Sequence, residues 1–326
     1  MGGLTKESRN GAVETWTLPG MVFLPGGAFR MGSDNHYPEE GPAHRGHVDG
    51  FWIAQAPVPN LEFAVFVAET NYRTLAERAP NPADYPGIKP EMMGAGSLVF
   101  SPPTHWIGLD DPFAWWRFEF GADWRHPYGP SSSIDALEAH PTVHIAYEDA
   151  QAYAAWAGKS LPTEAEWEFA ARGGLEGADY AWGDTFEPNG RPLANYWQGQ
   201  FPFHNLLSDG YSRTSPVDAF PPNGFGLHDM IGNVWEWTSD WFQPAHQGES
   251  RDGPKACCVP RNPRGGRSED SYDSFTPDIA IPRKVLKGGS HLCAPNYCQR
   301  YRPAARYPQP VDTSTSHVGF RCAIRA

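Results

Sequence analysis

The sequence predicts an α+β fold that is low in regular secondary structure. Of its 326 residues, 34 are glycine, 33 are proline and 13 are tryptophan. Glycine and proline spread along a chain interrupt long helices and strands, whereas an aromatic content of 13% is not typical of a disordered chain. We therefore expect short elements joined by loops that buried tryptophans hold in place, in one large domain or two.

The first elements are short. Residues 1–18 are expected to be a flexible tail. Two short strands are expected within 21–33, on either side of the turn at Pro25-Gly26-Gly27, and another strand over 47–57. Asn60 is expected to cap a helix that runs through Val67.

Residues 73–135 are the least regular part of the chain. They contain four tryptophans, at Trp106, Trp115, Trp116 and Trp124. A long stretch without clear elements is either functional or packed through its aromatic side chains. These tryptophans pack the stretch or wall a substrate groove, and the sequence leaves both interpretations open.

Two helices are predicted in the middle of the chain. A short strand over 142–146 precedes a helix from Tyr147 that Gly158 ends. A second helix begins after Thr163, which forms a capping box with Glu166, and Gly173 ends it.

The C-terminal half is predicted to be mostly strands and loops. Short strands and turns are expected over 180–242, and a polar surface loop over 243–283. Late core strands are expected at 285–287 and 318–323, on either side of a segment that holds two cysteines.

The charge excludes some partners. The net charge is −12 and the sequence pI is near 5.4, which argues against binding to nucleic acid or to an anionic membrane. No run of about 18 apolar residues predicts a membrane span. The N-terminus lacks the apolar core of a secretion signal, and the chain has an odd number of cysteines, five. We therefore expect a cytoplasmic protein whose thiols stay reduced.

Cys293 and Cys298 stand five positions apart, with Pro295 and Asn296 between them. Proline and asparagine favour a turn that would make the two thiols face each other. Facing thiols form a disulfide, hold a soft metal or do redox chemistry. The polar neighbours, which favour a thiolate, are Ser290, His291, Tyr297, Arg300 and Arg302. The spacing alone does not decide between these uses, although a reducing compartment favours the catalytic and metal-binding ones.

Six segments together resemble one family. They are PGGAFRMGS (25–33), GKSLPTEAEWEFAARGG (158–174), ANYWQGQFP (194–202), PPNGFGLHDMIGNVWEWTSDWF (221–242), KGGSHLCAPNYCQRYRPAAR (287–306) and GFRCA (319–323). The chain resembles the formylglycine-generating enzymes, or sulfatase-modifying factors, over almost its whole length. The resemblance implies a single catalytic domain over 19–326 with a C-type-lectin-like fold. It also implies oxidation by O2 of the cysteine in a Cys-x-Pro-x-Arg motif of an unfolded sulfatase to Cα-formylglycine.

The resemblance assigns the two cysteines to copper. Members of the family bind Cu(I) through the cysteines that match Cys293 and Cys298, and Cu(I) is a soft ion that prefers thiolates. We expect Cys298 to be the more exposed to substrate. A thiol reductant is the implied electron source, and a monomer is expected because no apolar stripe suggests an interface.

Four further side chains are implied at the site. Ser290 and Tyr297 match positions that line the pocket for oxygen and the substrate thiol, where their hydroxyls can donate hydrogen bonds. Trp235 is expected to wall the substrate pocket, and His317 to lie near it, although core packing is an alternative for both. Many family members have histidine where this chain has Ala294, so a proton relay there is not expected.

Two calcium sites are also implied, built from the hard oxygen ligands that calcium prefers. The first set is Asn195 and Asp209 with the carbonyls of Tyr196 and Tyr211. The second set is Asp229 and Glu236 with the carbonyls of Gly232 and Val234. The alternative is that the acidic residues only cap turns.

Other cysteines have simpler interpretations. Secreted animal members carry structural cysteines where this chain has Ala154, Ala171 and Pro303, so Cys322 is expected to be a buried, unpaired thiol. Cys257-Cys258 falls in the predicted surface loop and receives no firm role.

Two rival functions compete with this one. One is a non-catalytic binding module with the same fold, which has no need of both thiols. The other is an iron-dependent sulfoxide synthase, which needs a histidine triad that this sequence does not show.

Overall fold

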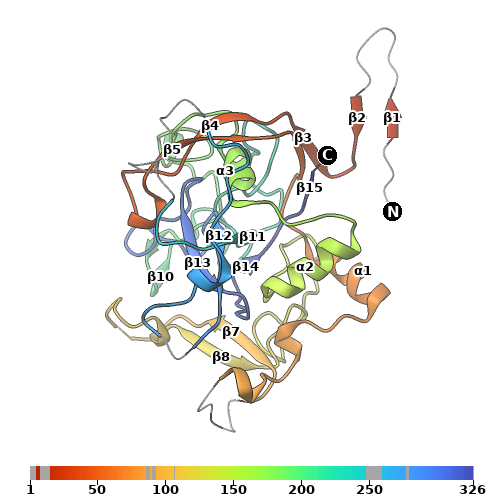
Figure 1. Cartoon of the computed structure of the whole chain (residues 1–326). Helices are drawn as coiled ribbons and strands as arrows, with labels where there is room; N and C mark the ends of the chain where they lie inside the picture. Colours follow the sequence, from red (N-terminus) through yellow and green to blue (C-terminus); the bar gives the residue numbers. More distant parts are fainter. Residues whose placement is uncertain are drawn as a thin grey trace.

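A four-stranded sheet lies at the centre of the fold, in a computed structural model that describes residues 5–7, 15–85, 89, 93–105, 107–246, 259–276 and 279–325. The strand order is β13–β12–β11–β14, at Arg306–Pro310, Arg283–Lys287, Trp235–Trp241 and Val318–Gly319. Strand β12 pairs antiparallel with both of its neighbours, and β14 runs parallel to β11. The sheet occupies the middle of the molecule in Figure 1.

Smaller antiparallel sheets surround the central one. A three-stranded sheet has the order β15–β6–β3, at Ala323–Arg325, Phe51–Ala54 and Met21–Leu24. The paired strands are β4 (Gly27–Met31) with β5 (His44–Val48), β7 (Gly96–Phe100) with β8 (Trp116–Phe120), β9 (Gly199–Gln200) with β10 (His204–Asn205), and β1 (Thr5–Glu7) with β2 (Thr15–Thr17). Strands β1 and β2 belong to the predicted tail, the rest of which lies mainly outside the described residues, so its flexibility stays a prediction.

Three α-helices, all of them short, lie in the described ranges of the chain. They are α1 (Asn60–Thr70), α2 (Tyr147–Trp156) and α3 (Glu164–Arg172). Brief 3-10 helices are η1 (Pro38–Glu40), η2 (Leu75–Glu77), η3 (Pro82–Asp84), η5 (Pro112–Ala114), η6 (Pro188–Gly190) and η7 (Ser268–Asp270). None of the helices in the described ranges is long and apolar enough to cross a bilayer.

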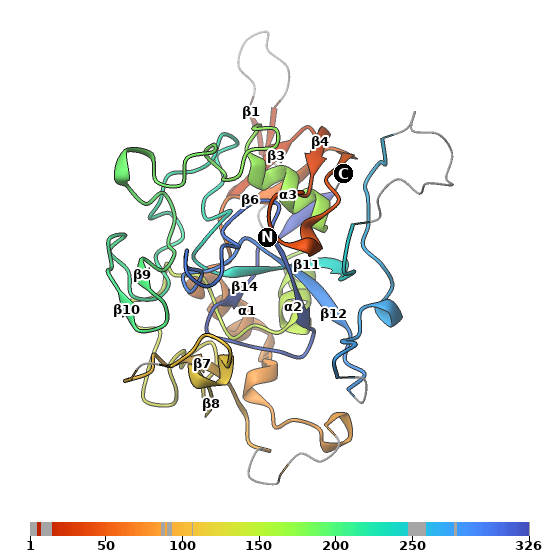
Figure 2. The ribbon, with the colours of Figure 1, turned by 90° about the vertical axis from the view of Figure 1, so that its left-hand side faces the viewer.

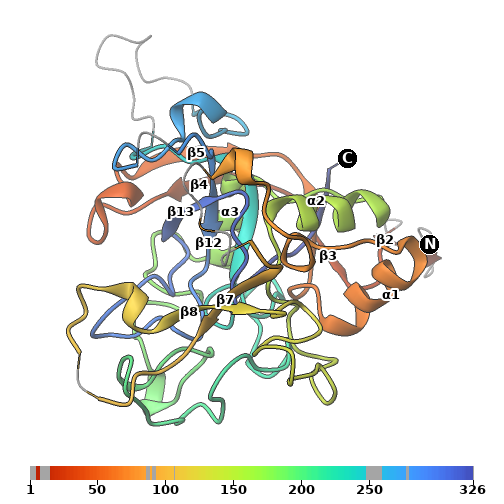
Figure 3. The ribbon, with the colours of Figure 1, turned by 90° about the horizontal axis from the view of Figure 1, so that it is seen from below.

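The helices cover different parts of the sheets. Helices α1 and α2 lie side by side at one edge of the molecule (Figures 1 and 3). Helix α3 packs between the β4–β5 hairpin and the central strands β11 and β12 (Figure 1). Long loops join these elements (Figure 2), so the predicted α+β fold with little regular structure is confirmed.

The helix predictions hold except at one cap. Thr163 caps α3 and forms the capping box with Glu166, and Gly173 ends the helix in the left-handed conformation at φ 56°. Helix α1 was predicted to be capped by Asn60, and this is wrong. Pro59 occupies the cap position, while the Asn60 amide donates to the carbonyl of Leu137 at 2.8 Å.

Several strand predictions need correction. Residues 142–146 form no strand, because Thr142 and His144 donate their N–H groups to different segments and His144 adopts φ 60°. The single strand predicted over 47–57 is replaced by β5 and β6, which belong to two sheets. The strand predicted over 318–323 is likewise divided between β14 and β15.

Buried tryptophans hold the irregular segments, as the composition predicted. Trp115, Trp124 and Trp237 are almost completely buried. The Trp237 indole donates to the carbonyl of Ile145 at 2.8 Å, which ties β11 to a loop far away in the sequence. Trp106 lies outside the described residues.

Buried ion pairs form a second set of ties. Glu168 on α3 accepts from Lys287 on β12 at 3.0 Å and from Arg172 at 2.7 Å, and all three side chains are buried. Burial alone would raise the pKa of Glu168, but Lys287 and Arg172 hold that pKa at about 2. The carboxylate therefore stays ionised and joins α3 to the central sheet.

Replacing Glu168 tests this tie. Glu168→Gln removes the ion-pair partner of Arg172 and leaves Lys287 only its longer 3.9 Å contact with Glu164, and loss of one partner from a buried ion pair costs about 3–5 kcal/mol. We expect that fall in the free energy of unfolding, measured by chemical denaturation at pH 7. The matched control is Asp270→Asn, which removes the exposed pair with Arg267 and should cost less than about 1 kcal/mol. Equal effects of the two substitutions would contradict the account.

Candidate active site

A tight turn brings Cys293 and Cys298 together. The carbonyl of Ala294 accepts the N–H of Tyr297 at 3.1 Å and of Cys298 at 3.0 Å. This turn folds the chain back over Pro295 and Asn296 and places the two Sγ atoms 3.2 Å apart. Both thiols are free. The facing arrangement predicted from the sequence is therefore present.

The two cysteines differ in exposure and in charge. Cys293 is buried at 2% exposure, whereas Cys298 is half-buried. The hydrogen bond between the two sulfur atoms and the nearby charge of Arg300 lower the pKa of Cys298 to about 6. Burial, together with the bond to Cys298, raises the pKa of Cys293. At neutral pH the pair therefore consists of a thiolate at Cys298 and a thiol at Cys293.

The buried side of the turn is held by backbone contacts. Cys293 donates its N–H to the carbonyl of Ser290 at 2.9 Å, and its own carbonyl accepts from Trp197. The N–H of Ser290 points at the Cys293 sulfur at 3.4 Å. The Ser290 hydroxyl is buried and accepts from the N–H of Leu292 at 3.2 Å. Ser290 thus lies beside Cys293, and its predicted role towards oxygen and the substrate thiol stays a prediction.

Tyr297 stands on the open side of the turn. Its ring stacks on Phe201 at a centroid distance of 4.5 Å and meets Trp115 edge to face at 5.4 Å. Asn296 fixes the same contact by exchanging hydrogen bonds with the backbone of Phe201. The Tyr297 residue remains 39% exposed. Burial, with the nearby Cys298, raises the pKa of Tyr297, so its phenol keeps its proton.

Trp235 and His317 make no hydrogen bond to the two sulfur atoms in the described residues. Trp235 is buried in the same apolar cluster as Cys293, against which Cys298 packs. The imidazole of His317 packs against Trp116 at 4.8 Å and bonds to Thr315 at 2.7 Å. Within the described residues, the hydrogen bonds of His317 lead to Thr315 and Trp235 rather than to a thiol. Their predicted contact with substrate stays a prediction.

Two predicted polar neighbours of the thiols point elsewhere. The Nδ1 atom of His291 bonds to the carbonyl of Asn233 at 2.8 Å. Arg302 forms a buried ion pair with Glu40. Of the two arginines, it is Arg300 that brings a cation to the pair, with Nη1 3.9 Å from the Cys298 sulfur.

The contact of the acidic loop predicted over 34–42 with this cation was not predicted from the sequence. The Tyr37 hydroxyl accepts the N–H of Gln299 at 3.0 Å, and Glu39 pairs with Arg300 at 2.6 Å. The two segments are 262 positions apart in the case of Gln299 and Tyr37. No spacing pattern connects them, so the sequence offered no signal for this contact.

The first predicted calcium set includes one buried oxygen without a hydrogen-bond partner in the described residues. Asn195 is 1% exposed, and its Oδ1 accepts no hydrogen bond from the described residues. The amide of Gln198 donates both to the carbonyl of Tyr196 and to Oδ2 of Asp209. Burial raises the pKa of Asp209, which a bound cation would reverse. These oxygens therefore fit a hard cation.

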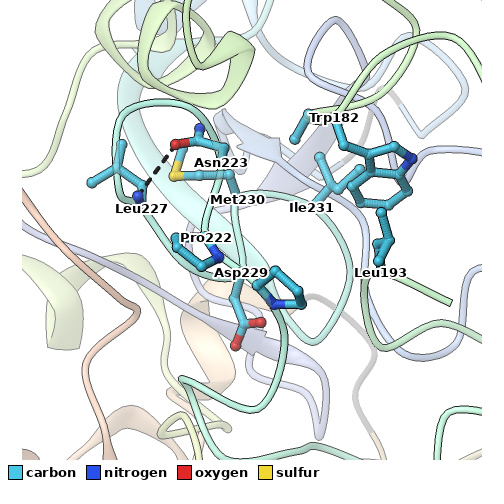
Figure 4. Close-up of a pocket in the computed structure, with 10 residues that line it drawn as sticks. Trp182, Leu193, Pro222, Asn223, Leu227, Asp229, Met230 and Ile231 are labelled. Carbon is cyan, nitrogen blue, oxygen red and sulfur yellow. Dashed lines mark hydrogen bonds between the residues drawn. The ribbon is translucent and has the colours of Figure 1, made fainter. Parts of the chain in front are cut away.

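The second calcium set fits less completely. Oδ1 of Asp229 is buried without a described partner, and burial raises the pKa of Asp229 to about 7. Glu236 is engaged by Arg321 through both of its oxygens and by the Trp167 indole. Oε1 of Glu236 accepts one of these three hydrogen bonds, and Oε2 accepts the other two. Asp229 also lines a pocket with Pro222 and Ile231, which Figure 4 shows.

The remaining residues of metal-binding types form no further metal site in the described part of the chain. No cluster of three or more His, Cys, Asp or Glu side chains in the described ranges is arranged to hold a metal ion. Cys322 is buried in the core and its thiol is free, as predicted. Cys257 and Cys258 lie outside the described residues.

Comparisons with known proteins give consistent results. The model of the sulfatase-modifying factor enzyme 1-like domain matches residues 6–326. The chain is 51% identical to the formylglycine-generating enzyme of Mycobacterium tuberculosis over 306 residues, covering 94% of this chain and 97% of that protein. It is 42% identical to the formylglycine-generating enzyme of Mus musculus, covering 94% and 75%. The structure of PvdO from Pseudomonas aeruginosa matches with a TM-score of 0.58 and 24% identity over 95% of each chain, which concerns the fold alone.

The difference in exposure and pKa between Cys298 and Cys293 predicts that an alkylating reagent modifies Cys298 first. With iodoacetamide at pH 7, Cys298 should react faster than Cys293, because it is more exposed and its pKa is about 6. The rate should fall as the pH drops below 6, where the Cys298 sulfur gains its proton. Peptide mass mapping measures each cysteine, and the control is Cys322, whose pKa burial raises to about 12. Preferential labelling of Cys293 would contradict the assignment.

Proposed function

This chain belongs to the sulfatase-modifying factor family and converts a sulfatase cysteine to formylglycine, and we propose that it does so with Cu(I) at Cys293 and Cys298 and with O2 as oxidant. The observation that carries the copper proposal is the 3.2 Å separation of the two Sγ atoms. Soft thiolate ligands select Cu(I), and Cys298 is the more exposed of the two cysteines, so substrate is proposed to approach from its side. When bound, Cu(I) would supply a redox centre for the reduction of O2.

The proposed reaction is balanced with a thiol reductant. The cysteine side chain of the substrate and one molecule of O2 take up two electrons and two protons. The products are an aldehyde, one molecule of hydrogen sulfide and one molecule of water. The electrons come from two reductant thiols that become a disulfide. The carbon is thereby oxidised by two electrons, and O2 accepts four.

The chain's own groups have separate tasks in this reaction. Cys293 is enclosed, so it holds its position while substrate approaches from the side of Cys298. Tyr297 keeps its phenol proton beside the open face and can donate a hydrogen bond to a charged oxygen or sulfur atom. Phe201 and Trp115 hold the ring of Tyr297 in place. Trp235 and His317 are proposed to line the substrate path.

Further parts of the proposal concern partners and location. The substrate is an unfolded sulfatase segment with a Cys-x-Pro-x-Arg motif, and the protein is proposed to be a cytoplasmic monomer. The acidic net charge of −12 supports a basic peptide partner over nucleic acid. Two calcium ions are proposed at the Asn195 and Asp229 sets, supported by the buried oxygens of these two residues.

Replacing either thiol tests the copper proposal. Cys293→Ser and Cys298→Ala should each lower formylglycine formation by more than about 100-fold, beyond the loss typical of residues around a metal ligand. Each variant should also lose Cu(I) binding, measured by competition with a chromophoric chelator, with an unchanged circular dichroism spectrum. Cys322→Ala is the control and should keep both properties. Substantial turnover in either thiol variant would refute the assignment.

Removing calcium tests the second part of the proposal. A chelator should lower the melting temperature, because an ion at 100 times its dissociation constant stabilises a fold by about 2.7 kcal/mol. Asp209→Asn should reduce the calcium-dependent part of the shift, and the exposed Asp270→Asn should not. An identical melting temperature with chelator and with added calcium would remove calcium from the proposal.

A further inference from the structure

The guanidinium of Arg300 is held on several sides next to Cys298. It lies over the ring of Tyr37 at 3.7 Å and pairs with Glu39 at 2.6 Å. The ring of Tyr307 lies 5.4 Å away. Nη1 is 3.9 Å from the Cys298 sulfur, within reach of a charge-assisted contact. The side chain is 18% exposed, so solvent reaches it only in part.

Arg300 is not the only residue that holds the loop 37–40 in place. The neighbouring pair of Arg302 and Glu40 also fastens this loop, with Nη1 of Arg302 2.7 Å from Oε2 of Glu40 and both side chains buried. The pair of Arg300 and Glu39 adds to this anchoring, with side chains 18% and 17% exposed. Anchoring the loop does not by itself explain why one guanidinium nitrogen of Arg300 also reaches the Cys298 sulfur.

The difference between the two arginines lies in what they face. The guanidinium of Arg302 bonds to Glu40 and to the carbonyl of Gln299 and lies 5.8 Å from the Tyr37 ring, and none of its hydrogen bonds in the described residues goes to a sulfur atom. The guanidinium of Arg300 turns to the Cys298 sulfur. A guanidinium keeps its charge at all working pH values and has a rigid planar donor set, so its place relative to the sulfur is well defined.

We propose that Arg300 is a positioning residue for Cys298, and that Tyr37 and Glu39 hold its guanidinium against the sulfur. The inference deepens the proposed function and rests on it, because Cys298 is the ligand that substrate would reach. Arg300 keeps the Cys298 side chain turned towards Cys293. Without it the sulfur gains rotational freedom, and the two thiols no longer present one preformed pair.

The chain offers a closely matched control. Arg125 lies over the ring of Trp124 at 4.2 Å and pairs with Glu77 at 2.8 Å. It repeats the combination of aromatic stacking and ion pairing, and no cysteine sulfur is among its contacts in the described part of the chain. Arg125→Gln therefore removes the same kinds of interaction without touching the thiol pair.

The experiment compares Arg300→Gln, Arg300→Lys, Glu39→Gln and Tyr37→Leu with Arg125→Gln. Cu(I) affinity is measured by chelator competition, and kcat and KM are measured with a Cys-x-Pro-x-Arg peptide. Arg300→Gln should weaken Cu(I) binding by about tenfold, within the range for residues around a metal ligand, and should lower kcat more than it raises KM. Arg300→Lys should recover part of this loss, because it keeps the charge but not the planar stack.

A double substitution separates positioning from general destabilisation. Since Glu39 is proposed to act through Arg300, adding Glu39→Gln to Arg300→Gln should cause no further loss of Cu(I) affinity. Glu39→Gln and Tyr37→Leu alone should each weaken binding by about threefold, in line with the range for an ion pair in the first case and for a cation–π contact in the second. Losses that add, or a loss in Arg125→Gln equal to that in Arg300→Gln, would overturn the proposal.

A readout without copper keeps the two proposals distinguishable. In copper-free protein, the ratio of alkylation at Cys298 to that at Cys293 reports both the charge beside Cys298 and how the thiols are presented. Arg300→Lys keeps the charge but not the planar donor set, so it and Arg300→Gln should both change the ratio, while Arg125→Gln should not. An unchanged ratio in Arg300→Gln would overturn the positioning role. If the wild-type protein bound no Cu(I), the proposed function would fail, and the alkylation ratio alone would decide the role of Arg300.

Discussion

The buried ion pair between Arg302 and Glu40 fixes where the cysteine turn lies in the molecule. It joins positions 262 residues apart, in a region where neither partner belongs to an extended helix or sheet. A fold with short strands and helices cannot hold its loops through backbone ladders alone. Side chains must supply the ties, and a buried charge is tolerated only with its partner in place.

The segment 287–306 combines this scaffold with the chemistry. Lys287 pairs with Glu168, and Arg306 pairs with Glu164, so both ends of the segment are anchored in the core next to α3. The two thiols lie between these anchors, on a turn that projects from the central sheet. These ion pairs add little net stability, but removing one partner of a buried pair is strongly destabilising. Their main effect is therefore to fix the position of the segment. A rigid frame of this kind can keep two thiols facing each other without a disulfide.

Elements that local interactions hold could be predicted from the sequence, whereas contacts between distant segments could not. The helix after Thr163 was predictable because its capping box and its terminal glycine are local, and the turn between the cysteines was predictable from Pro295 and Asn296. Strand β13 was not predicted, because Pro308 and Pro310 argue against a strand, yet it pairs at the edge of the sheet. The contact of Tyr37 with Gln299 could not be predicted for another reason, because it depends on how two loops that are distant in the sequence pack together.

The account is tested most directly by incubating the purified protein with a synthetic Cys-x-Pro-x-Arg peptide, Cu(I), a thiol reductant and air, and analysing the peptide by mass spectrometry. The account predicts that the cysteine is replaced by an aldehyde that a hydrazide probe traps, and that chelation of copper abolishes the product. An unmodified peptide in the presence of protein with copper demonstrably bound to Cys293 and Cys298 would contradict it.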